Sequence, residues 1–382
     1  MRFVVQISFT ILFMITACRN SIALKDANHN GIGIMTYGPN LQRNFYINEE
    51  LNYEDLEVFW ENETHGSFDN FSVTMYDNFV FVPDLAGRVY VFDKETGKMY
   101  GHEDNDGEMP VTVNINNNKI YYFINNTKER YFTLNIFNYR FGSLYKEIKI
   151  KGKCSNEPLK LSDGLIILTE EGRLLKFDFI GENIWEYDSK EISISDPACM
   201  GDNIYWGTVK GNLISVDARN GELNYKNKIS NSRIEAGITL IENRGYIGDV
   251  EGTLFKININ KGVVEDRIML DARTKSNPVI NNSKLFIGDM SGNIYSIDIN
   301  EMEIDWTTFV EGIINTTPLL FNNILVQPNL NKKVHFININ NGNIEKEFEY
   351  DSRVKMTPVY FDNTLYIGID RGILFAYKTK FN

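Results

Sequence analysis

The chain has 382 residues, of which 43% are hydrophobic and 13% aromatic, with 28 glycines and 9 prolines. Such a chain can bury a large core, and its wealth of aromatic residues and glycine favours an all-β fold with many turns. Its formal net charge of −12 argues against a nucleic-acid partner, because nucleic-acid binding needs a basic surface that displaces counterions. No run of lysine or arginine indicates a patch for anionic lipids.

The chain begins with a candidate leader. Arg2 precedes an apolar stretch from Phe3 to Ile15, which is too short to span a bilayer as a mature helix. The stretch leads into ITAC, ending at Cys18, which resembles the lipobox of bacterial lipoproteins, whose cysteine is acylated and becomes the N-terminus. Three acyl chains at roughly 0.8 kcal/mol per buried CH₂ would anchor the protein stably. The alternative is an ordinary signal peptide with a chance cysteine.

The next feature in chain order is an isolated predicted strand, LEVFWENE, at residues 56–63. It contains an aromatic residue, Trp60, and no companion strands precede it. A repeat follows, marked by a glycine before a short apolar segment, and in two copies Glu129 and Lys332 replace the glycine. The glycines are Gly87, Gly172, Gly211, Gly252, Gly292 and Gly372. The steps of 42, 43, 39, 41, 40, 40 and 40 residues are typical of propeller blades or helical repeats.

The local pattern within each copy favours strands over helices. Short apolar runs such as DNIYWGTV and SKLFIGDM lie upstream of the glycine, and shorter runs such as NPVI and TTPLL lie before them. A third strand follows the glycine, and then come an Asp/Asn-x-x-x-Gly loop and a fourth strand. The fourth strand carries an aromatic residue: Tyr100, Trp185, Tyr225 or Trp306. We expect the glycines to take positive φ and Asp217 and its equivalents to cap the loop backbone.

The third strands are apolar on both faces, as in LISV and IYSI, so both faces must be covered. Sheets arranged radially around an axis cover one another in this way, and the sequence therefore predicts an all-β, eight-bladed β-propeller of four-stranded antiparallel blades. The last copy ends after its third strand, so the N-terminal strand containing Trp60 is expected to complete that blade. We expect a signal peptide at 1–17, a mobile lipid-anchored linker at 18–45 and a single propeller domain at 46–382.

The residues give little support for chemistry. Cys154 and Cys199 match no zinc spacing, and they are either a disulfide or two buried thiols. The four histidines are scattered, and no catalytic or phosphate-binding motif is present. Recurring Asp-containing turns such as YIGDVEG favour a turn role over metal binding. We therefore expect no enzyme activity, no cofactor and no metal.

The strand, Asp-x-x-Thr-Gly and aromatic pattern, seen best in VFDKETGKMY, resembles the repeat of PQQ-type propellers. Eight such units behind a lipobox resemble the BamB family, lipoprotein subunits of the machine that assembles outer-membrane β-barrels. The resemblance implies a non-catalytic scaffold on the periplasmic face of the outer membrane of a Gram-negative bacterium. Arg19, rather than Asp, after the cysteine resembles the outer-membrane sorting pattern. The implied partners are the POTRA domains of a BamA-like barrel and unfolded outer-membrane proteins.

The resemblance also implies a docking surface on the loops of two neighbouring blades. Ile192 and Ile194 in EISISDPA match the family's apolar pair, and Ser195 stands where the family has arginine. The family has two acidic residues, one residue apart, at the entry to the next blade. In SRIEAG, Glu235 matches one of these acids, and Arg233 stands in place of the other. The bland alternative is an alternating strand edge without a partner. Two functions stay open beside the scaffold: another lipid-anchored propeller that binds a different protein or small ligand, and a PQQ-dependent dehydrogenase. The dehydrogenase would need carboxylates and an amide around a calcium, a base aspartate and, typically, adjacent cysteines. Cys154 and Cys199 are not adjacent, the chain is short for that enzyme class, and tryptophan is scarce.

Overall fold

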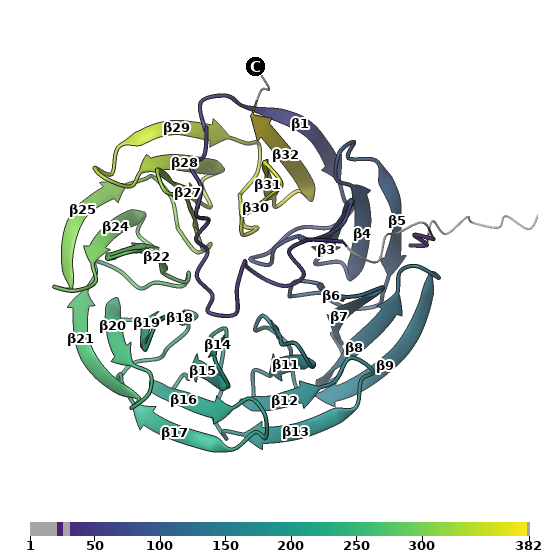
Figure 1. The fold of residues 1–382 in the computed structure, drawn as a ribbon, viewed down its shortest axis with the longest axis horizontal. Helices are drawn as coiled ribbons and strands as arrows, with labels where there is room; N and C mark the ends of the chain where they lie inside the picture. Colours follow the sequence, from purple (N-terminus) through teal and green to yellow (C-terminus); the bar gives the residue numbers. More distant parts are fainter. Residues whose placement is uncertain (1–20, 26–30, 380–382) are drawn as a thin grey trace, which may run out of the picture.

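A computed structural model of the chain describes residues 21–25 and 31–379, so the predicted signal peptide and the predicted lipidation site, Cys18, lie outside the described residues. The described part contains 32 strands arranged as eight four-stranded antiparallel sheets. These sheets stand around a central axis as the blades of a propeller (Figure 1). The predicted all-β, eight-bladed propeller is confirmed.

The first four blades follow one another along the chain. They are β2 (Thr74–Tyr76), β3 (Phe79–Asp84), β4 (Arg88–Asp93), β5 (Met99–Asp104); β6 (Asn114–Asn116), β7 (Lys119–Asn125), β8 (Tyr131–Asn138), β9 (Ser143–Lys151); β10 (Leu159–Lys160), β11 (Leu165–Leu168), β12 (Arg173–Phe177), β13 (Asn183–Asp188); and β14 (Ala198–Met200), β15 (Asn203–Gly207), β16 (Asn212–Asp217), β17 (Leu223–Lys228).

The remaining blades use the C-terminal half and the first strand. They are β18 (Thr239–Ile241), β19 (Arg244–Gly248), β20 (Thr253–Asn258), β21 (Val263–Met269); β22 (Val279–Asn281), β23 (Lys284–Gly288), β24 (Asn293–Asp298), β25 (Glu303–Phe309); β26 (Leu319–Leu320), β27 (Ile324–Pro328), β28 (Lys333–Asn338), β29 (Ile344–Glu349); and β30 (Val359–Phe361), β31 (Thr364–Ile369), β32 (Ile373–Thr379), β1 (Leu56–Glu63).

The N-terminal strand closes the ring, as predicted. β1 pairs antiparallel with β32 from Leu56↔Thr379 to Glu63↔Ile373, with an irregularity between Val58 and Trp60. The eighth blade is therefore made from both ends of the described chain. The pairing therefore gives the last blade four strands, like the other seven.

In four blades the aromatic residue of the fourth strand donates a hydrogen bond to a backbone carbonyl of the next blade; these residues are Trp60, Trp185, Tyr225 and Trp306. Trp185 Nε1 donates to the Ala218 carbonyl at 3.2 Å, and its ring packs on Gly221 in the loop of the following blade. In the same way, Trp60 Nε1 donates to the Lys94 carbonyl at 2.9 Å, and Trp306 Nε1 donates to the Ile339 carbonyl at 3.1 Å. The recurring aspartate, glycine and aromatic residue thus form a connection between blades.

The glycines that mark the repeat adopt positive φ angles, as predicted. All six glycines that mark the repeat have φ between 76° and 98°. Lys332, which replaces the glycine in one copy, also has a positive φ of 65°, and Met302 takes the loop-glycine position with φ 52°. Asp217 Oδ1 accepts a hydrogen bond from the backbone N–H of Arg219 at 2.8 Å, so the predicted loop capping is confirmed.

Residues 31–47 form a segment that we call the N-terminal strap. Figure 1 shows this purple segment crossing the centre of the ring before it reaches β1. Its backbone carbonyls accept hydrogen bonds from the innermost strands of several blades, including Leu41 from Cys199 and Phe45 from Leu320. The expectation of a mobile polar tether is wrong for residues 31–45, because Tyr37, Arg43 and Phe45 are buried there.

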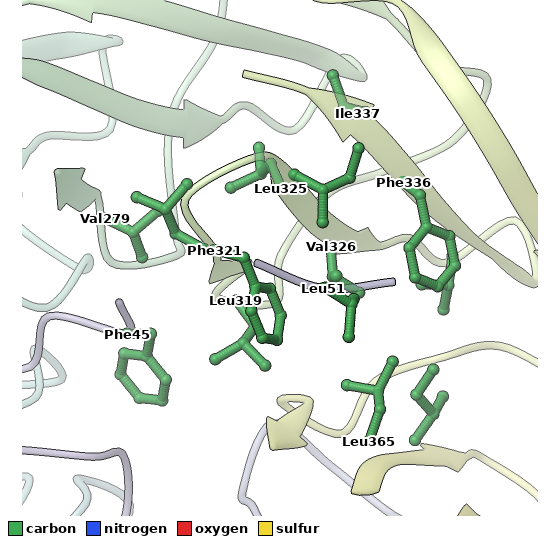
Figure 2. Packing of buried hydrophobic residues seen from close by; sticks show 14 of the residues in the cluster. Phe45, Leu51, Val279, Leu319, Phe321, Leu325, Val326, Phe336, Ile337 and Leu365 are labelled. Atoms are coloured by element: carbon green, nitrogen blue, oxygen red, sulfur yellow. The ribbon is translucent and has the colours of Figure 1, made fainter. Parts of the chain in front are cut away.

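Part of the core depends on this N-terminal region. Figure 2 shows Phe45 and Leu51 among buried side chains from successive blades, including Val279, Leu319 and Leu365. Burial of each such side chain stabilises the fold by roughly 1.5–3 kcal/mol. The N-terminal region is therefore packed as an integral layer of the domain.

Both cysteines in the described residues are buried free thiols. Burial raises the pKa of Cys199 to about 11, and it raises that of Cys154 well above its ordinary value. Of the two alternatives left open by the sequence, the structure has the unpaired one.

Candidate functional site: the inner polar ring and the loops of one face

Eight equivalent positions, one at the start of each blade, surround the central channel. We call them the inner polar ring: Ser72, Thr112, Glu157, Asp196, Gly237, Asn277, Thr317 and Thr357. Each lies two residues before the first residue of the innermost strand of its blade. The spacing of these positions follows the repeat of about 40 residues, so they could be aligned from the sequence. Their residue types vary too much for the alignment to suggest a shared role.

Side chains in this ring accept hydrogen bonds from the backbone N–H of the preceding member. Thr112 Oγ1 accepts from Ser72 at 2.9 Å, and the Glu157 carboxylate accepts from Thr112 at 3.1 Å. Asp196 Oδ1 in turn accepts from Glu157 at 2.7 Å. The next member is Gly237, which has no side chain, so this relation is interrupted after Asp196.

The interruption leaves the amide of Asn277 beside Gly237. A Cβ at residue 237 would lie 2.5 Å from Asn277 Oδ1, so the amide occupies the space that a side chain would fill. Asn277 is 2% exposed, and its Nδ2 has no hydrogen-bond partner. A buried amide donor without a partner costs about 1–3 kcal/mol, which makes this a position where a bound group would gain energy.

Arg43 of the strap lies against the acidic part of the ring. Its guanidinium donates to four backbone carbonyl oxygens: Tyr37 at 2.7 Å, Glu157 at 2.8 Å, Pro158 at 2.9 Å and Pro197 at 3.0 Å. Arg43 is fully buried, and its positive charge lies among groups that include two neighbouring carboxyls, Glu157 and Asp196.

The two carboxyl groups are perturbed by this environment. Burial, together with the neighbouring charge of Asp196, raises the pKa of Glu157 to about 8, although Arg43 and Thr112 act in the opposite direction. Burial also raises the pKa of Asp196, against the influence of Arg43. Burial therefore disfavours the charged forms of both acids, although Arg43 lies near both and Lys275 lies near Asp196.

A cavity of about 370 Å³ opens above the ring, and we call it the funnel. Tyr37 of the strap lines it, so the strap limits its inner end. Its rim uses positions two residues before the ring members: Asn70, Pro110, Ser155, Ile194, Glu235, Lys275 and Asn315. Two of the residues predicted to dock a partner, Ile194 and Glu235, are thus rim residues of this cavity.

The structure exposes the predicted apolar pair. Ile192 is 55% exposed and Ile194 36% exposed, on the loop between β13 and β14. The Ile192 carbonyl accepts from Val209 and the Arg233 carbonyl from Val250, both at 3.0 Å, so Ile192 and Arg233 are equivalent positions of successive blades. The structure therefore brings the predicted residues to one face.

Ser195 is placed differently from its neighbours. It is fully buried, and its hydroxyl donates to the Ala236 carbonyl at 2.7 Å in the next blade. Its side chain is therefore not available to a partner and instead holds two adjacent loops together. Arg233 and Glu235 form an ion pair with Nη2 and Oε1 3.3 Å apart, so the single acid that matches the family is partly neutralised.

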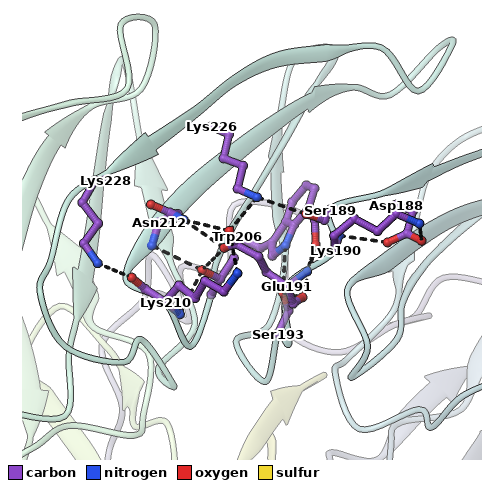
Figure 3. Close-up of polar contacts among 11 residues, drawn as sticks. Asp188, Ser189, Lys190, Glu191, Ser193, Trp206, Lys210, Asn212, Lys226 and Lys228 are labelled. Atoms are coloured by element: carbon purple, nitrogen blue, oxygen red, sulfur yellow. Dashed lines mark hydrogen bonds and ion pairs between the residues drawn. The ribbon is translucent and has the colours of Figure 1, made fainter.

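The loop that carries Ile192 is fixed by Glu191, which sequence reasoning missed. Figure 3 shows the Glu191 carboxylate surrounded by donors, with Lys226 Nζ at 2.6 Å and Asn212 Nδ2 at 2.9 Å. Thr208 Oγ1 donates at 2.8 Å. Burial alone would raise the pKa of Glu191, but the hydrogen bonds from Lys226, Asn212 and Thr208 lower it overall. Glu191 therefore anchors the loop as a buried carboxylate.

No group of three or more His, Cys, Asp or Glu side chains in residues 21–25 and 31–379 is arranged to hold a metal ion. Within the same ranges, no helix has the length and apolar character needed to cross a membrane.

Comparison with known proteins places the fold in a family. The family model described as outer membrane protein assembly factor BamB matches residues 147–380, more than half of the chain. The chain belongs to the BamB family. The crystal structure of BamB from Moraxella catarrhalis is similar, with a TM-score of 0.72 and 13% identity over 85% of this chain and 99% of that one.

Propellers outside the BamB family share the same architecture. A europium-containing methanol dehydrogenase has a TM-score of 0.72 and 10% identity, covering 88% of this chain and 89% of that one. The quinohemoprotein alcohol dehydrogenase from Comamonas testosteroni has a TM-score of 0.74 and 11% identity, covering 94% and 83%. At these identities the likeness shows the fold alone. None of the curated protein sequences matches this chain.

Proposed function

We propose that this protein is a non-catalytic scaffold subunit of the outer-membrane β-barrel assembly machine. In this proposal its propeller docks on the POTRA domains of a BamA-like barrel and helps barrel proteins to insert. The observation that carries the proposal is the BamB family match over residues 147–380. The exposed Ile192 and Ile194 on a loop held by Glu191 support it, because rigid apolar residues on a loop suit protein recognition.

The proposed location is the periplasmic face of the outer membrane, with a lipid on Cys18. The support is the lipobox-like sequence that ends at Cys18. Cys18→Ala, or treatment with the signal-peptidase inhibitor globomycin, should abolish lipid attachment. Unchanged partitioning of the variant with membranes would contradict this part of the proposal.

The docking proposal is tested by recovering the partner. Full-length tagged protein, extracted from membranes in mild detergent, should co-purify a barrel with POTRA domains. A double substitution, Ile192→Asp with Ile194→Asp, should reduce recovery at least tenfold. Ile180→Asp is the matched control, since Ile180 is 52% exposed and lies on the loop between the third and fourth strands of its blade, outside the proposed surface.

Two outcomes would replace the proposal. An eluate without any such barrel would favour a lipid-anchored propeller that binds a different protein or a small ligand. Uptake of PQQ with calcium, seen as a new chromophore, would favour a dehydrogenase. Against the dehydrogenase stand two unpaired cysteines, Cys154 and Cys199, that are far apart in the sequence, and the funnel, whose lining carries six acids against two lysines, which disfavours an anionic quinone.

A further inference from the structure

Most of the charged side chains that line the funnel are acidic. Its lining includes six acids and two lysines, and the acids are Asp69, Glu108, Glu157, Glu170, Asp196 and Glu235. One lysine is already matched, because Lys153 Nζ lies 3.0 Å from Glu170. Low-dielectric walls concentrate the field of such a cavity, so a cation is favoured over an anion there.

The wall also presents polar atoms that lack partners. Asn70 Oδ1 and Ser155 Oγ are buried and unpaired, and both residues lie on the rim. Deeper in the funnel, Asn277 Nδ2 is unpaired beside the gap at Gly237, and Asp196 stands on the other side of that gap in the ring order. The site therefore offers acceptors for a cationic group and one buried amide donor for a neighbouring carbonyl.

The combination of these groups defines the chemistry of the occupant. A lysine or arginine side chain supplies the positive charge and several N–H donors, and the peptide backbone that carries it supplies carbonyl acceptors. The volume of about 370 Å³ is in the range of pockets that enclose a small group. A charge-assisted hydrogen bond in such a site is stronger than one in open solvent.

We propose that the funnel binds a basic polypeptide segment whose lysine or arginine side chain enters the gap between Asp196 and Asn277. Asp196 accepts hydrogen bonds from the ammonium or guanidinium group, and Asn277 Nδ2 donates to a backbone carbonyl of the segment. Because Ile194 and Glu235 belong to the same rim, a protein docked on this face supplies the segment. In that respect the inference rests on the proposed docking, whereas cation binding itself does not.

The test uses full-length protein in non-ionic detergent and isothermal titration calorimetry. The probe is acetylated, amidated tetralysine, and the matched probe has every lysine ε-acetylated. Tetralysine should bind, and raising the salt from about 50 to 500 mM should weaken binding because screening shortens the reach of the charges. Equal binding of the two probes would overturn the proposal.

Variants locate the site. Asp196→Asn should weaken tetralysine binding about tenfold, and Glu235→Gln, at the more exposed rim, about threefold. Gly237→Ser should also weaken it, because the added side chain displaces the Asn277 amide and fills the gap. Glu251→Gln is the control: Glu251 carries the same charge and lies outside the funnel lining. Unchanged binding in the first three variants, each folded by its melting temperature, would contradict the site.

The two proposals fail separately. If tetralysine does not bind while the barrel still co-purifies, the funnel site is wrong and the docking function stands. If tetralysine binds with the expected variant pattern but no barrel is recovered, the funnel stands and the proposed docking partner is wrong.

Discussion

Arg43 Nη2 donates to the backbone carbonyl oxygen of Glu157 at 2.8 Å, and this contact fastens the N-terminal strap to the inner polar ring. The strap thus brings a buried positive charge to the part of the ring where Glu157 and Asp196 follow one another. Because buried carbonyls need donors, the guanidinium serves the backbone and the carboxyls together.

Replacing Arg43 should destabilise the fold strongly. Arg43→Met would leave four buried carbonyls without this donor and two carboxyls without their nearby cation. We expect the free energy of unfolding in urea to fall by about 3–5 kcal/mol. Arg267→Met, at an exposed position of β21, should change it by less than about 0.5 kcal/mol. Equal effects of the two substitutions would show that the Arg43 contacts do not stabilise the fold.

Glu157 should make stability fall as the pH rises. Its pKa is about 8 in the folded protein and about 4.3 in an unfolded chain, so stability is full below about 4.3 and declines until about 8. Glu157→Gln removes this ionisation. Urea titrations between pH 5 and pH 9 should therefore show the variant gaining stability relative to the unsubstituted protein as pH increases. A difference that stays constant with pH would contradict the prediction.

Glu191 should have the opposite dependence. Its pKa is lowered in the folded protein, so its stabilising contribution is present above about pH 4.3 and is lost as the pH falls through the folded pKa. The stability difference between the unsubstituted protein and Glu191→Gln should therefore shrink from pH 6 to pH 3. Hydrogen exchange of residues 189–195 at pH 7 should be faster in the variant, and an unchanged rate would remove Glu191 as the anchor of the loop.

The contact between Trp185 and Gly221 predicts a contrast between two glycines. At Gly221, φ is 77° and a Cβ would meet the Trp185 ring at 2.7 Å, whereas at Gly201 φ is 58° and nothing lies within 4 Å. Gly221→Ala should therefore cost about 2–4 kcal/mol from strain and overpacking. Gly201→Ala should cost about 1 kcal/mol, from φ alone. Similar losses in thermal unfolding would argue against the aromatic connection between blades.

The ring itself could be predicted from the sequence because its signals recur. Eight copies allow one uncertain strand to be checked against seven others, and apolar residues on both faces of strands such as β16 and β24 require neighbours on both sides. The lone strand with Trp60 and the incomplete last copy then predicted closure. These arguments need only periodicity and burial, both of which a sequence displays directly.

The strap and the details of the site were harder to predict from the sequence because they occur only once in the chain. Tyr37 and Arg43 have no equivalent copies, and a polar segment outside a repeat is ordinarily a linker. Glu191 resembles any loop acid until the donors from another strand and another loop are placed around it. Whether the Ser195 side chain points outward or inward depends on the alternation of exposed and buried side chains in its loop, in which Ile194 is exposed and Ser195 is buried.

The pairing of β1 with β32 makes folding of the eighth blade depend on synthesis of the chain through its last described strand. Among the described strands β1 is synthesised before all others and its partner β32 after them, so the eighth blade forms only once the chain has been made as far as β32. A product that stops before Ile373 leaves β1 without its partner, and an unpaired edge is a template for aggregation. A truncation before β32 therefore exposes the edge of β1, near the opposite end of the chain.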